Sequence, residues 1–267
     1  VMFDFLYQYF TVWGVIAAYI VFLAVRSNVM FGHLQYKYRL ALIRALLRAT
    51  QSKDSTLMAH LENVAYLSKR LAPECGYSRL KLHGFDEACY YHDIGKLKRP
   101  QYFIENQIEG ENIHDTLSPS LSALIILSHV QEGINLAKEY GLPSAMIDFI
   151  AEHHGTTCLS YFYNKARRNG DKVDKDQYCY PGPKPRSKET ALLMLADSVE
   201  AAVRALGPSV LDITTLDDAV KQVIEVKKQE GQLDEVNLTM KDLSAIRQAF
   251  VTTLMSMYHT RWVRDKK

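Results

Sequence analysis

The amino-terminal end of this chain carries a long run without any charged residue. Residues Phe5 to Val25 read FLYQYFTVWGVIAAYIVFLAV, with no Asp, Glu, Lys or Arg. An α-helix needs about 20 predominantly apolar residues to cross the hydrocarbon core of a bilayer. The run therefore predicts a transmembrane helix, which we place at residues 1–26, with residues 5–25 in contact with the membrane.

The carboxyl-terminal flank of this run is basic. Acidic residues are absent from Val25 to Gln51, and an excess of Lys and Arg on one flank predicts that this flank is cytoplasmic. A secretory signal peptide would have a basic start and a small-residue cleavage site, and neither is visible. A buried core helix is the other alternative, although so long a run without charge is unusual in a soluble domain. The basic residues of the flank are Arg26, Lys37, Arg39, Arg44 and Arg48.

Residues 27–52 are expected to form a basic connector helix between the membrane and the rest of the chain. Apolar residues recur there at helical spacing, with Lys and Arg between them. This helix either packs on the following domain or lies on the membrane surface, and the sequence leaves both interpretations open. We assign the remaining residues 53–262 to one domain.

Composition supports a folded domain and argues against a nucleic-acid polymer as partner. Hydrophobic residues make up 48% and charged residues 23% of the 267 residues, which allows a sizeable core. The net charge of +2 gives no general attraction for nucleic acid. The four cysteines show no C-x-x-C spacing, so we expect buried or free thiols in a reducing compartment, and neither a disulfide framework nor a zinc ribbon.

The pattern after residue 53 is helical throughout, and no segment alternates at period two. We therefore expect an all-α helical bundle. Ser118 followed by Pro119 predicts a helix start, as does Ser187, and Thr239 with Asp242 resembles a capping box. Gly95 is placed to end the helix that carries His92.

Side chains of metal-binding type are spread along this helical region. Imidazole and carboxylate groups are ligands for divalent metals, and one ion rarely takes more than four protein ligands. The number found here suffices for two ions if one carboxylate bridges them, and two ions about 3.5–4 Å apart suit the in-line hydrolysis of a phosphate ester. The candidate ligands are His60, His92, Asp93, His129, His153, His154 and Asp197.

Two adjacent pairs among these residues favour a shared site over separate core histidines. Neighbouring helix residues point about 100° apart, so both members of a pair can reach one centre only where a helix ends. A glycine follows each pair, at Gly95 and Gly155. Asp197 lies in the apolar segment LMLADSV, where a carboxylate is costly unless it is paired or bound to metal.

The pattern of His60, His92-Asp93 and Asp197 resembles the HD-domain phosphohydrolases, and His129 with His153-His154 is similar to their binuclear branch. Further segments resemble the cytoplasmic domain of the seven-transmembrane HD family, the PgpH-type cyclic di-AMP phosphodiesterases, over about residues 53–260. These segments include YHDIGKL (91–97), HHGTT (153–157), YPGPKP (180–185), LADSVEA (195–201) and GQLD (231–234).

The resemblance implies a binuclear enzyme in a bacterial inner membrane. One ion would be held by His60, His92, Asp93 and Asp197, and the other by Asp93, His129, His153 and His154, with Asp93 bridging. The mixed ligand set suits iron or manganese better than magnesium. A hydroxide activated by both ions would hydrolyse cyclic di-AMP to pApA. The run 5–25 would be the last membrane helix of that family, and the earlier membrane helices would precede this chain.

Further residues are candidates for catalysis or for substrate contact. Lys96 follows the ligand pair, and either holds a phosphate oxygen or neutralises the carboxylates. Amide side chains can bind a base edge, and tyrosines can stack on adenine. Besides Lys96, the candidate substrate contacts are Asn106, Gln107, His114, Thr156, Thr157, Tyr163, Tyr180 and Lys184.

Two alternative functions share this ligand pattern. A cyclic di-GMP phosphodiesterase of the HD-GYP type would carry a Gly-Tyr-Pro motif soon after the His doublet, whereas Gly155-Thr156-Thr157 follows it here. A non-catalytic nucleotide-sensing module would be expected to lack ligands. The sequence does not determine the oligomeric state.

Overall fold

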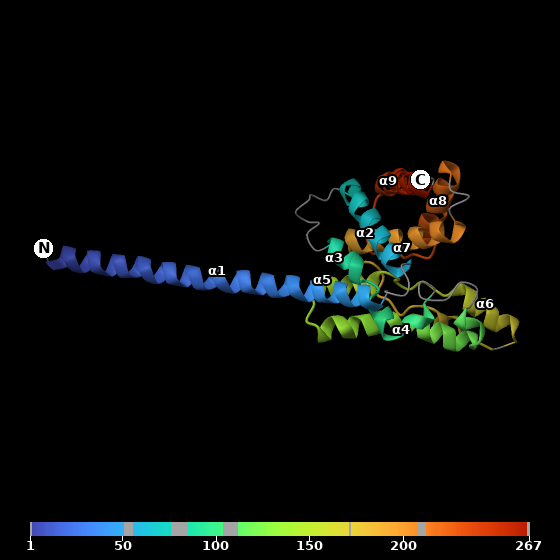
Figure 1. Ribbon diagram of the computed structural model, residues 1–267, viewed down its shortest axis with the longest axis horizontal. Coiled ribbons are helices and arrows are strands. Elements are labelled where there is room, and N and C mark those ends of the chain that lie inside the picture. Colours follow the sequence, from blue (N-terminus) through green and yellow to red (C-terminus); the bar gives the residue numbers. More distant parts are fainter. Residues whose placement is uncertain are drawn as a thin grey trace. The chain divides into compact units, whose positions relative to one another are not determined.

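The computed structural model describes residues 2–50, 56–75, 85–103, 112–170, 172–207 and 212–265. The chain divides into two compact units, residues 1–46 and residues 47–267, and each is described here by itself (Figure 1). Every regular element within the described ranges is a helix, apart from one isolated bridge. The expected all-α class is therefore confirmed.

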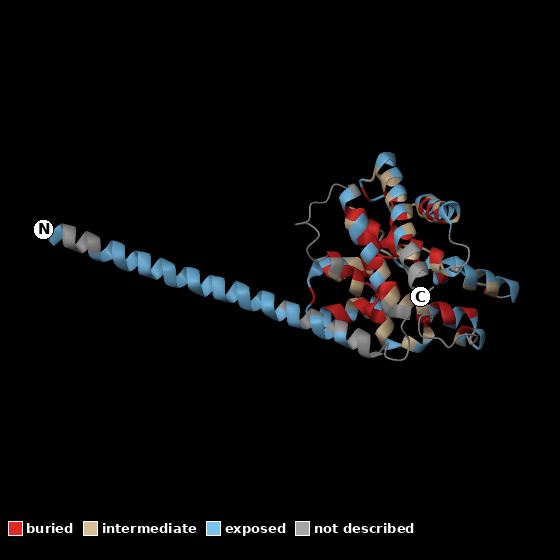
Figure 2. Cartoon of the chain, turned by 45° about the horizontal axis from the view of Figure 1, so that its top comes forward, coloured by how far each residue is buried: buried red, intermediate tan, exposed pale blue. Residues whose placement is uncertain are grey.

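The amino-terminal unit consists of the single helix α1, Met2–Thr50. This uninterrupted helix covers residues 2–26 of the predicted membrane segment, 1–26, and residues 27–50 of the predicted connector, 27–52. Its side chains are exposed wherever they are described (Figure 2). By length and composition, the part from Tyr9 to Gln35 is long and apolar enough to cross a membrane. No other helix in the described ranges meets that criterion.

The second unit is a bundle of α-helices joined by short 3-10 helices. The α-helices are α2 Thr56–Leu71, α3 Phe85–Tyr91, α4 Pro119–Glu139, α5 Ser144–Glu152, α6 Ser160–Arg168, α7 Lys188–Leu206, α8 Ile213–Gln229 and α9 Met240–Asp265. The 3-10 helices are η1 Ala72–Cys75, η2 Ile94–Lys98, η3 Pro100–Tyr102, η5 Ile113–Asp115 and η6 Lys175–Tyr178.

The helix starts follow the capping residues that the sequence offers. Ser118 accepts a hydrogen bond from the Leu121 N–H and is followed by Pro119 at the first turn of α4. Ser187 forms a capping box with Thr190 at the start of α7. Such caps satisfy backbone N–H groups that have no partner inside the helix. The predicted starts of both helices are confirmed.

Helix α7 runs through the centre of the bundle. It packs against α2, α5 and α8, and almost every residue from Thr190 to Val203 is buried. Leu192, Leu195 and Val199 belong to a core that α2, α3, α8 and α9 complete. Burying one such side chain stabilises the fold by about 1.5–3 kcal/mol. Figure 2 shows buried residues gathered within the helical unit.

Helix α4 crosses η2 at two glycines, Gly95 of η2 and Gly133 of α4. A Cβ on Gly95 would lie 1.8 Å from the carbonyl oxygen of His129 and 2.6 Å from the backbone nitrogen of Gly133. Only glycine permits this approach, which brings the segment after His92 against α4. The prediction that Gly95 ends the preceding helix is wrong, because α3 already ends at Tyr91 and Gly95 lies inside η2.

Two cysteines are paired, contrary to the expectation of free thiols. Cys158 and Cys179 face each other across the isolated antiparallel bridge, and a disulfide joins them. Hydrogen bonds from the Leu159 N–H to the Tyr178 carbonyl and from the Tyr180 N–H to the Thr157 carbonyl flank the pair. Sequence spacing could not reveal this pairing, since the two residues meet only when the segment between them folds back.

Candidate metal centre

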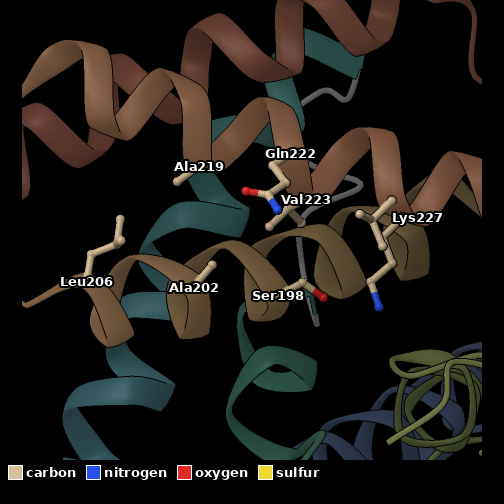
Figure 3. A pocket seen from close by; sticks show the side chains of 8 residues that line it. Ser198, Ala202, Leu206, Ala219, Gln222, Val223 and Lys227 are labelled. Atoms are coloured by element: carbon tan, nitrogen blue, oxygen red, sulfur yellow. The ribbon is translucent and has the colours of Figure 1, made fainter. Parts of the chain in front are cut away.

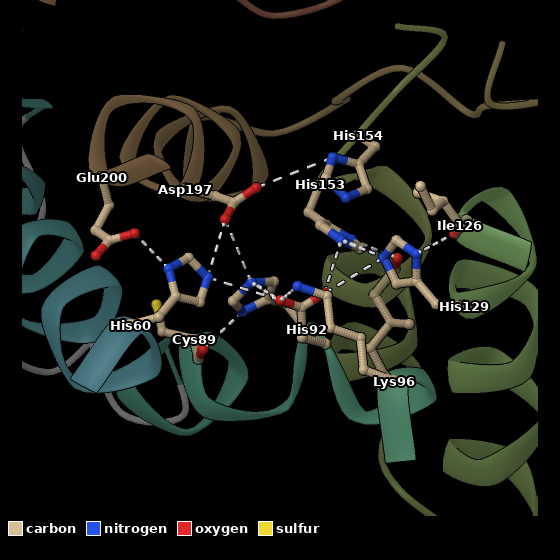
Figure 4. A network of polar contacts seen from close by, with 12 residues as sticks. His60, Cys89, His92, Lys96, Ile126, His129, His153, His154, Asp197 and Glu200 are labelled. Carbon is tan, nitrogen blue, oxygen red and sulfur yellow. Dashed lines mark hydrogen bonds and ion pairs between the residues drawn. The ribbon is translucent and has the colours of Figure 1, made fainter. Parts of the chain in front are cut away.

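All the candidate ligands converge at one place in the bundle (Figure 4). They form two groups whose ligand atoms lie within 4.8 Å of one another. The first group comes from α2, the turn after α3, and α7. The second comes from that same turn, α4, and the end of α5. The first group is His60, His92, Asp93 and Asp197, and the second is Asp93, His129, His153 and His154.

Asp93 belongs to both groups and directs one oxygen to each. Its Oδ2 lies 3.2 Å from Nε2 of His92 and 3.7 Å from Nε2 of His60. Its Oδ1 lies 3.3 Å from Nε2 of His129 and 3.7 Å from Nε2 of His153. A carboxylate placed in this way has the geometry of a bridging ligand.

Asp197 closes the two groups from the side of α7. Its Oδ1 lies 3.2 Å from Nε2 of His60 and 3.8 Å from Nε2 of His92, while its Oδ2 lies 3.9 Å from Nδ1 of His154. The carboxylate that the sequence places in an apolar helix is therefore surrounded by imidazoles.

Most of the imidazole rings are held by a hydrogen bond on the nitrogen that points away from the centre. Nδ1 of His92, of His129 and of His153 lies 2.7, 2.6 and 2.8 Å from the backbone carbonyl three residues earlier. When Nδ1–H donates to that carbonyl, the lone pair of Nε2 faces the centre, as metal coordination requires.

Several atoms that face the centre are buried without a hydrogen-bond partner among the described residues. They are Nε2 of His60, Nε2 of His92 and Oδ1 of Asp93. Buried polar atoms are normally satisfied, and an orphan of this kind points to a missing ligand such as an ion. Nε2 of His129 and Nε2 of His153 also face each other at 3.3 Å. The residues present therefore fit a pair of divalent ions.

The carboxylates and the first group of histidines hold opposite charges in the absence of metal. Burial raises the pKa of Asp93, but Lys96 and His92 outweigh burial and hold that pKa well below its usual value. Burial lowers the pKa of His92, but the carboxylates of Asp93 and Asp197 outweigh it and raise that pKa to about 9. The pKa of His60 is raised for the same reason.

Two histidines of the second group, His153 and His154, are held neutral. Burial lowers the pKa of His154, and the neighbouring His153 and His129 lower it further. Burial also lowers the pKa of His153. Neutral imidazole is the form that binds metal, so these side chains are already in their ligand state at neutral pH.

Three side chains that support the centre were not found by sequence reasoning. Glu200, Glu152 and Gln232 are each 2% exposed. Oε2 of Glu200 lies 2.5 Å from Nδ1 of His60. Glu200 follows Asp197 by three residues on one helix, and residues at this spacing share a face. This spacing could have identified Glu200 from the sequence.

Glu152, the residue before the His doublet, fixes the chain that leads into α7. Its carboxylate accepts hydrogen bonds from the Arg186 backbone N–H at 2.9 Å, from Nε of Arg186 at 2.7 Å and from the Thr190 hydroxyl at 2.7 Å. The end of α5 and the start of α7 are therefore tied together beside two ligands.

Lys96 and Tyr180 are the candidate substrate residues that the structure brings to the ligands. Nζ of Lys96 lies 2.8 Å from Oδ2 of Asp93. The Tyr180 ring stacks on the His154 ring, with centroids 4.3 Å apart, and meets the His129 ring edge-on at 5.8 Å. Burial raises the pKa of Tyr180, which keeps its hydroxyl protonated.

The remaining candidates lie in other surroundings. Nε2 of the buried His114 lies 2.7 Å from the Tyr102 carbonyl, and the His114 ring packs against Phe162. The Tyr163 ring packs against Tyr178. None of these described contacts reaches a candidate ligand.

Lys184 lies beside the segment 231–234, with Nζ 3.3 Å from the position of a Cβ at Gly231. Two pairs of candidates remain. Thr156 and Thr157 lie in the turn after His154, where the Thr157 hydroxyl donates to the His154 carbonyl at 2.7 Å. Asn106 and Gln107 fall outside the described residues.

A groove also opens between α7 and α8 (Figure 3). Its volume is about 340 Å³, and it is mainly apolar, with Ser198, Gln222 and Lys227 as polar members. Ser198 directly follows Asp197 in the chain. Burial lowers the pKa of Lys227, while Glu230 and Asp197 act in the opposite direction.

Paired His/Asp clusters in a helical bundle define a class of protein, the metal-dependent phosphohydrolases with a binuclear centre. The model of the HD domain matches residues 57–202. The chain belongs to the HD-domain family, and its helical unit is an HD domain of the PgpH type.

Curated relatives share much of this chain. It is 42% identical over 217 residues to the cyclic-di-AMP phosphodiesterase PgpH of Bacillus subtilis strain 168, covering 81% of this chain and 30% of that protein. It is 40% identical over 217 residues to PgpH of Listeria monocytogenes serotype 1/2a strain 10403S, covering 81% and 29%. The chain thus spans less than a third of the length of these relatives.

Solved structures agree with the sequence comparison. The HD domain of L. monocytogenes PgpH superposes with a TM-score of 0.73 at 38% identity, covering 80% of this chain and 99% of that one. The same domain solved in complex with cyclic-di-AMP gives a TM-score of 0.73 at 38% identity, covering 80% and 97%.

Proposed function

We propose that this chain is a metal-dependent phosphodiesterase that hydrolyses cyclic di-AMP to pApA. The observation that carries the proposal is the solved L. monocytogenes domain, which binds cyclic-di-AMP and has the fold of this chain at 38% identity. The complete set of candidate ligands supports turnover over binding alone, because a sensing module would not need to preserve both halves of the centre.

In this proposal each of the two groups of ligands would hold one metal ion. His60, His92 and Asp197 would hold one ion, His129 with the His153-His154 pair would hold the other, and Asp93 would bridge them. The nitrogen-rich ligand set suits iron or manganese. When bound, such a pair of ions lowers the pKa of the attacking water and neutralises charge on the phosphoryl oxygens.

Lys96 would then hold the phosphate in place. In the structure its ammonium group is paired with Asp93 at 2.8 Å, on the side of the carboxylate that faces the first group. A phosphoryl oxygen arriving at the centre competes for this ammonium group, which is compact and carries three donors. Lys96 thus supplies a point charge for the phosphate, while Asp93 keeps its bridging position.

The second half of the centre offers an aromatic surface to the substrate. Tyr180 is stacked on His154 and is mostly buried, so the pocket wall beside the second group is apolar and aromatic. A nucleobase can stack on such a wall.

The membrane assignment is also part of the proposal. Helix α1 would span a bacterial inner membrane through residues 5–25 and keep the helical unit in the cytoplasm. The apolar part of α1 and the basic residues after it support this arrangement. Fractionation of cells expressing the chain should leave it in the membrane fraction until detergent is added; a fully soluble chain at normal yield would contradict the assignment.

Incubation of the purified chain with cyclic di-AMP or cyclic di-GMP, with and without Mn²⁺, tests the activity. We expect metal-dependent formation of pApA, with kcat/KM higher for cyclic di-AMP. Both substrates present the same phosphodiester, so the discrimination arises at the bases, where one unpaired buried polar group costs about 1–3 kcal/mol. Equal kcat/KM values, or a preference for cyclic di-GMP, would favour the HD-GYP alternative and leave the metal chemistry intact.

A further inference from the structure

The ligand His154 lacks the anchor that the other imidazoles have. His92, His129 and His153 are held through Nδ1 by a backbone carbonyl, and His60 by Glu200. Among the described residues no hydrogen bond reaches the ring of His154, whose Nδ1 lies 3.9 Å from Asp197. Its side chain is also the most exposed of the ligands, at 22%. The backbone turn that carries it must therefore fix its position.

That turn begins with a glycine in the left-handed region of backbone conformation. Gly155 has a φ of +55°. A Cβ at Gly155 would lie 2.3 Å from Oε1 of Gln232 and 2.9 Å from Cε of Met194. The turn is thus pressed against the side chain of Gln232, which comes from the connection between α8 and α9.

Gln232 binds the next residue of the turn through both ends of its amide. The Thr156 backbone N–H donates to Oε1 of Gln232 at 2.9 Å, and Nε2 of Gln232 donates to the Thr156 hydroxyl at 2.9 Å. Gln232 is 2% exposed, so water does not compete for these hydrogen bonds. In a buried setting the loss of such a pair leaves an unsatisfied donor and acceptor.

The connection that presents Gln232 is itself fixed. Gly231 has a φ of +66°, and a Cβ there would lie 2.6 Å from Oδ2 of Asp234 and 3.3 Å from Nζ of Lys184. The backbone N–H of Gln232 donates to the Lys227 carbonyl at the end of α8. The segment GQLD, which sequence analysis singled out without a role, is therefore a rigid support beside the turn.

We infer that Gln232 is a positioning residue for the second metal, acting through Thr156 on the turn that aims His154. Gln232 is 2% exposed, and both ends of its amide are occupied by Thr156, so the side chain acts on the turn. The first group has its own anchors, so its ion does not depend on Gln232. The inference rests on the two-metal centre of the proposed function but not on its substrate.

Binding of Mn²⁺ to the full metal-free chain in detergent tests this role. Gln232→Met keeps the side-chain volume and removes both hydrogen bonds. We expect the variant to bind the first Mn²⁺ as the wild type does and the second at least tenfold more weakly by calorimetry. In the electron paramagnetic resonance spectrum, the coupled-pair signal of the wild type should give way to that of an isolated ion.

Two further variants distinguish a selective loss of the second ion from a general loss of stability. Thr156→Val keeps the backbone N–H and removes only the hydroxyl, so we expect the same selective loss to a smaller extent. Thr253→Val changes a buried hydroxyl on α9 that donates to the Ala249 carbonyl, and it should leave both affinities unchanged.

The results of these binding experiments test the positioning role of Gln232 separately from the substrate assignment. Second-site affinities within twofold of wild type in both Gln232→Met and Thr156→Val, or equal weakening of both sites, would overturn the inference. A wild-type chain that binds a single Mn²⁺ would overturn it as well. Selective loss of the second ion in a chain that does not cleave cyclic di-AMP would support the positioning role and refute only the substrate assignment.

Discussion

Glu200 lies with Oε2 2.5 Å from Nδ1 of His60, although 140 residues separate the two in the chain. Arg204 and Asn63 also bind this carboxylate, at 3.3 and 3.2 Å. Burial raises the pKa of Glu200, but His60 and Arg204 outweigh it and lower that pKa. The carboxylate is thus charged and fixes His60 with Nε2 toward the centre, as supporting groups of metal ligands do.

Replacing Glu200 should weaken the first metal site. Glu200→Ala removes the anchor of His60, and loss of such a support typically lowers metal affinity by about 10–100-fold. Glu200→Gln keeps an acceptor and should lose less. Mn²⁺ titration of each variant measures the effect. Glu225→Gln, an exposed carboxylate on α8, serves as control and should bind as wild type does; equal affinity in Glu200→Ala would show that His60 needs no support.

The two halves of the centre should respond differently to ligand removal. Asp93→Ala removes the shared carboxylate, so we expect loss of both ions and of activity. His129→Ala removes a ligand of one group, so chiefly the second ion should be lost. Metal analysis after dialysis measures both. Two ions and near-normal turnover in Asp93→Ala would refute the bridging role.

Metal binding at the first site should release protons. The pKa of His92 is raised to about 9 in the metal-free protein, because Asp93 and Asp197 outweigh the effect of burial. Its charge therefore stabilises the metal-free fold fully below the unfolded pKa of about 6.5, and this stabilisation is lost as pH rises through about 9. A ligand must be neutral, so Mn²⁺ affinity should rise with pH across that window.

Calorimetry in buffers with different ionisation enthalpies detects the released protons. The pKa values of His153 and His154 are lowered, so these ligands are already neutral at pH 7. Proton release should accompany the first ion and not the second. Release that is equal for both ions, or absent, would contradict the charge assignment of the two groups.

Lys96 should affect turnover more than metal content. Lys96→Met removes the ammonium group that we assign to a phosphoryl oxygen, and we expect kcat/KM to fall by about 100-fold, since a charged hydrogen bond in a dry site contributes about 3 kcal/mol. Both ions should remain. If the variant instead lost metal in proportion to activity, Lys96 would serve only to neutralise Asp93.

The crossing of η2 and α4 should not tolerate a larger residue at Gly95. Gly95→Ala places a Cβ 1.8 Å from the His129 carbonyl oxygen, so the two segments must separate. Overpacking of this kind typically lowers the free energy of unfolding by about 1–3 kcal/mol. Urea denaturation measures the change. Gly32→Ala, with no atom within 4 Å of the added Cβ, is the control, and equal stability of the two variants would show that the crossing is not tight.

Much of the centre was accessible from the sequence, because ligand chemistry and helix periodicity are local properties. The types and positions of the ligands predicted a shared site with enough ligands for two ions, and the resemblance to the HD family supplied the division into two groups. Ser118, Ser187 and Thr239 marked helix starts because a cap depends only on the residues next to it. The charge-free run near the amino terminus likewise predicted a helix, which α1 forms.

Other features depend on contacts between distant segments, which no local pattern encodes. Gly95 was expected to end a helix, yet its role is to let η2 approach α4 beside His129. Cys158 was expected to be a free thiol, yet folding of the chain sets it opposite Cys179. These two expectations failed because backbone proximity is decided by packing.

The sequence by itself determined which groups could bind metal and that helices would carry them, because both follow from residue type and spacing. Only the tertiary structure decided how those groups are aimed. The anchoring of His60 by Glu200 and the support of the His154 turn by Gln232 each join segments that are far apart in the chain. Such contacts form only when the helices pack, because their geometry depends on the relative placement of whole elements.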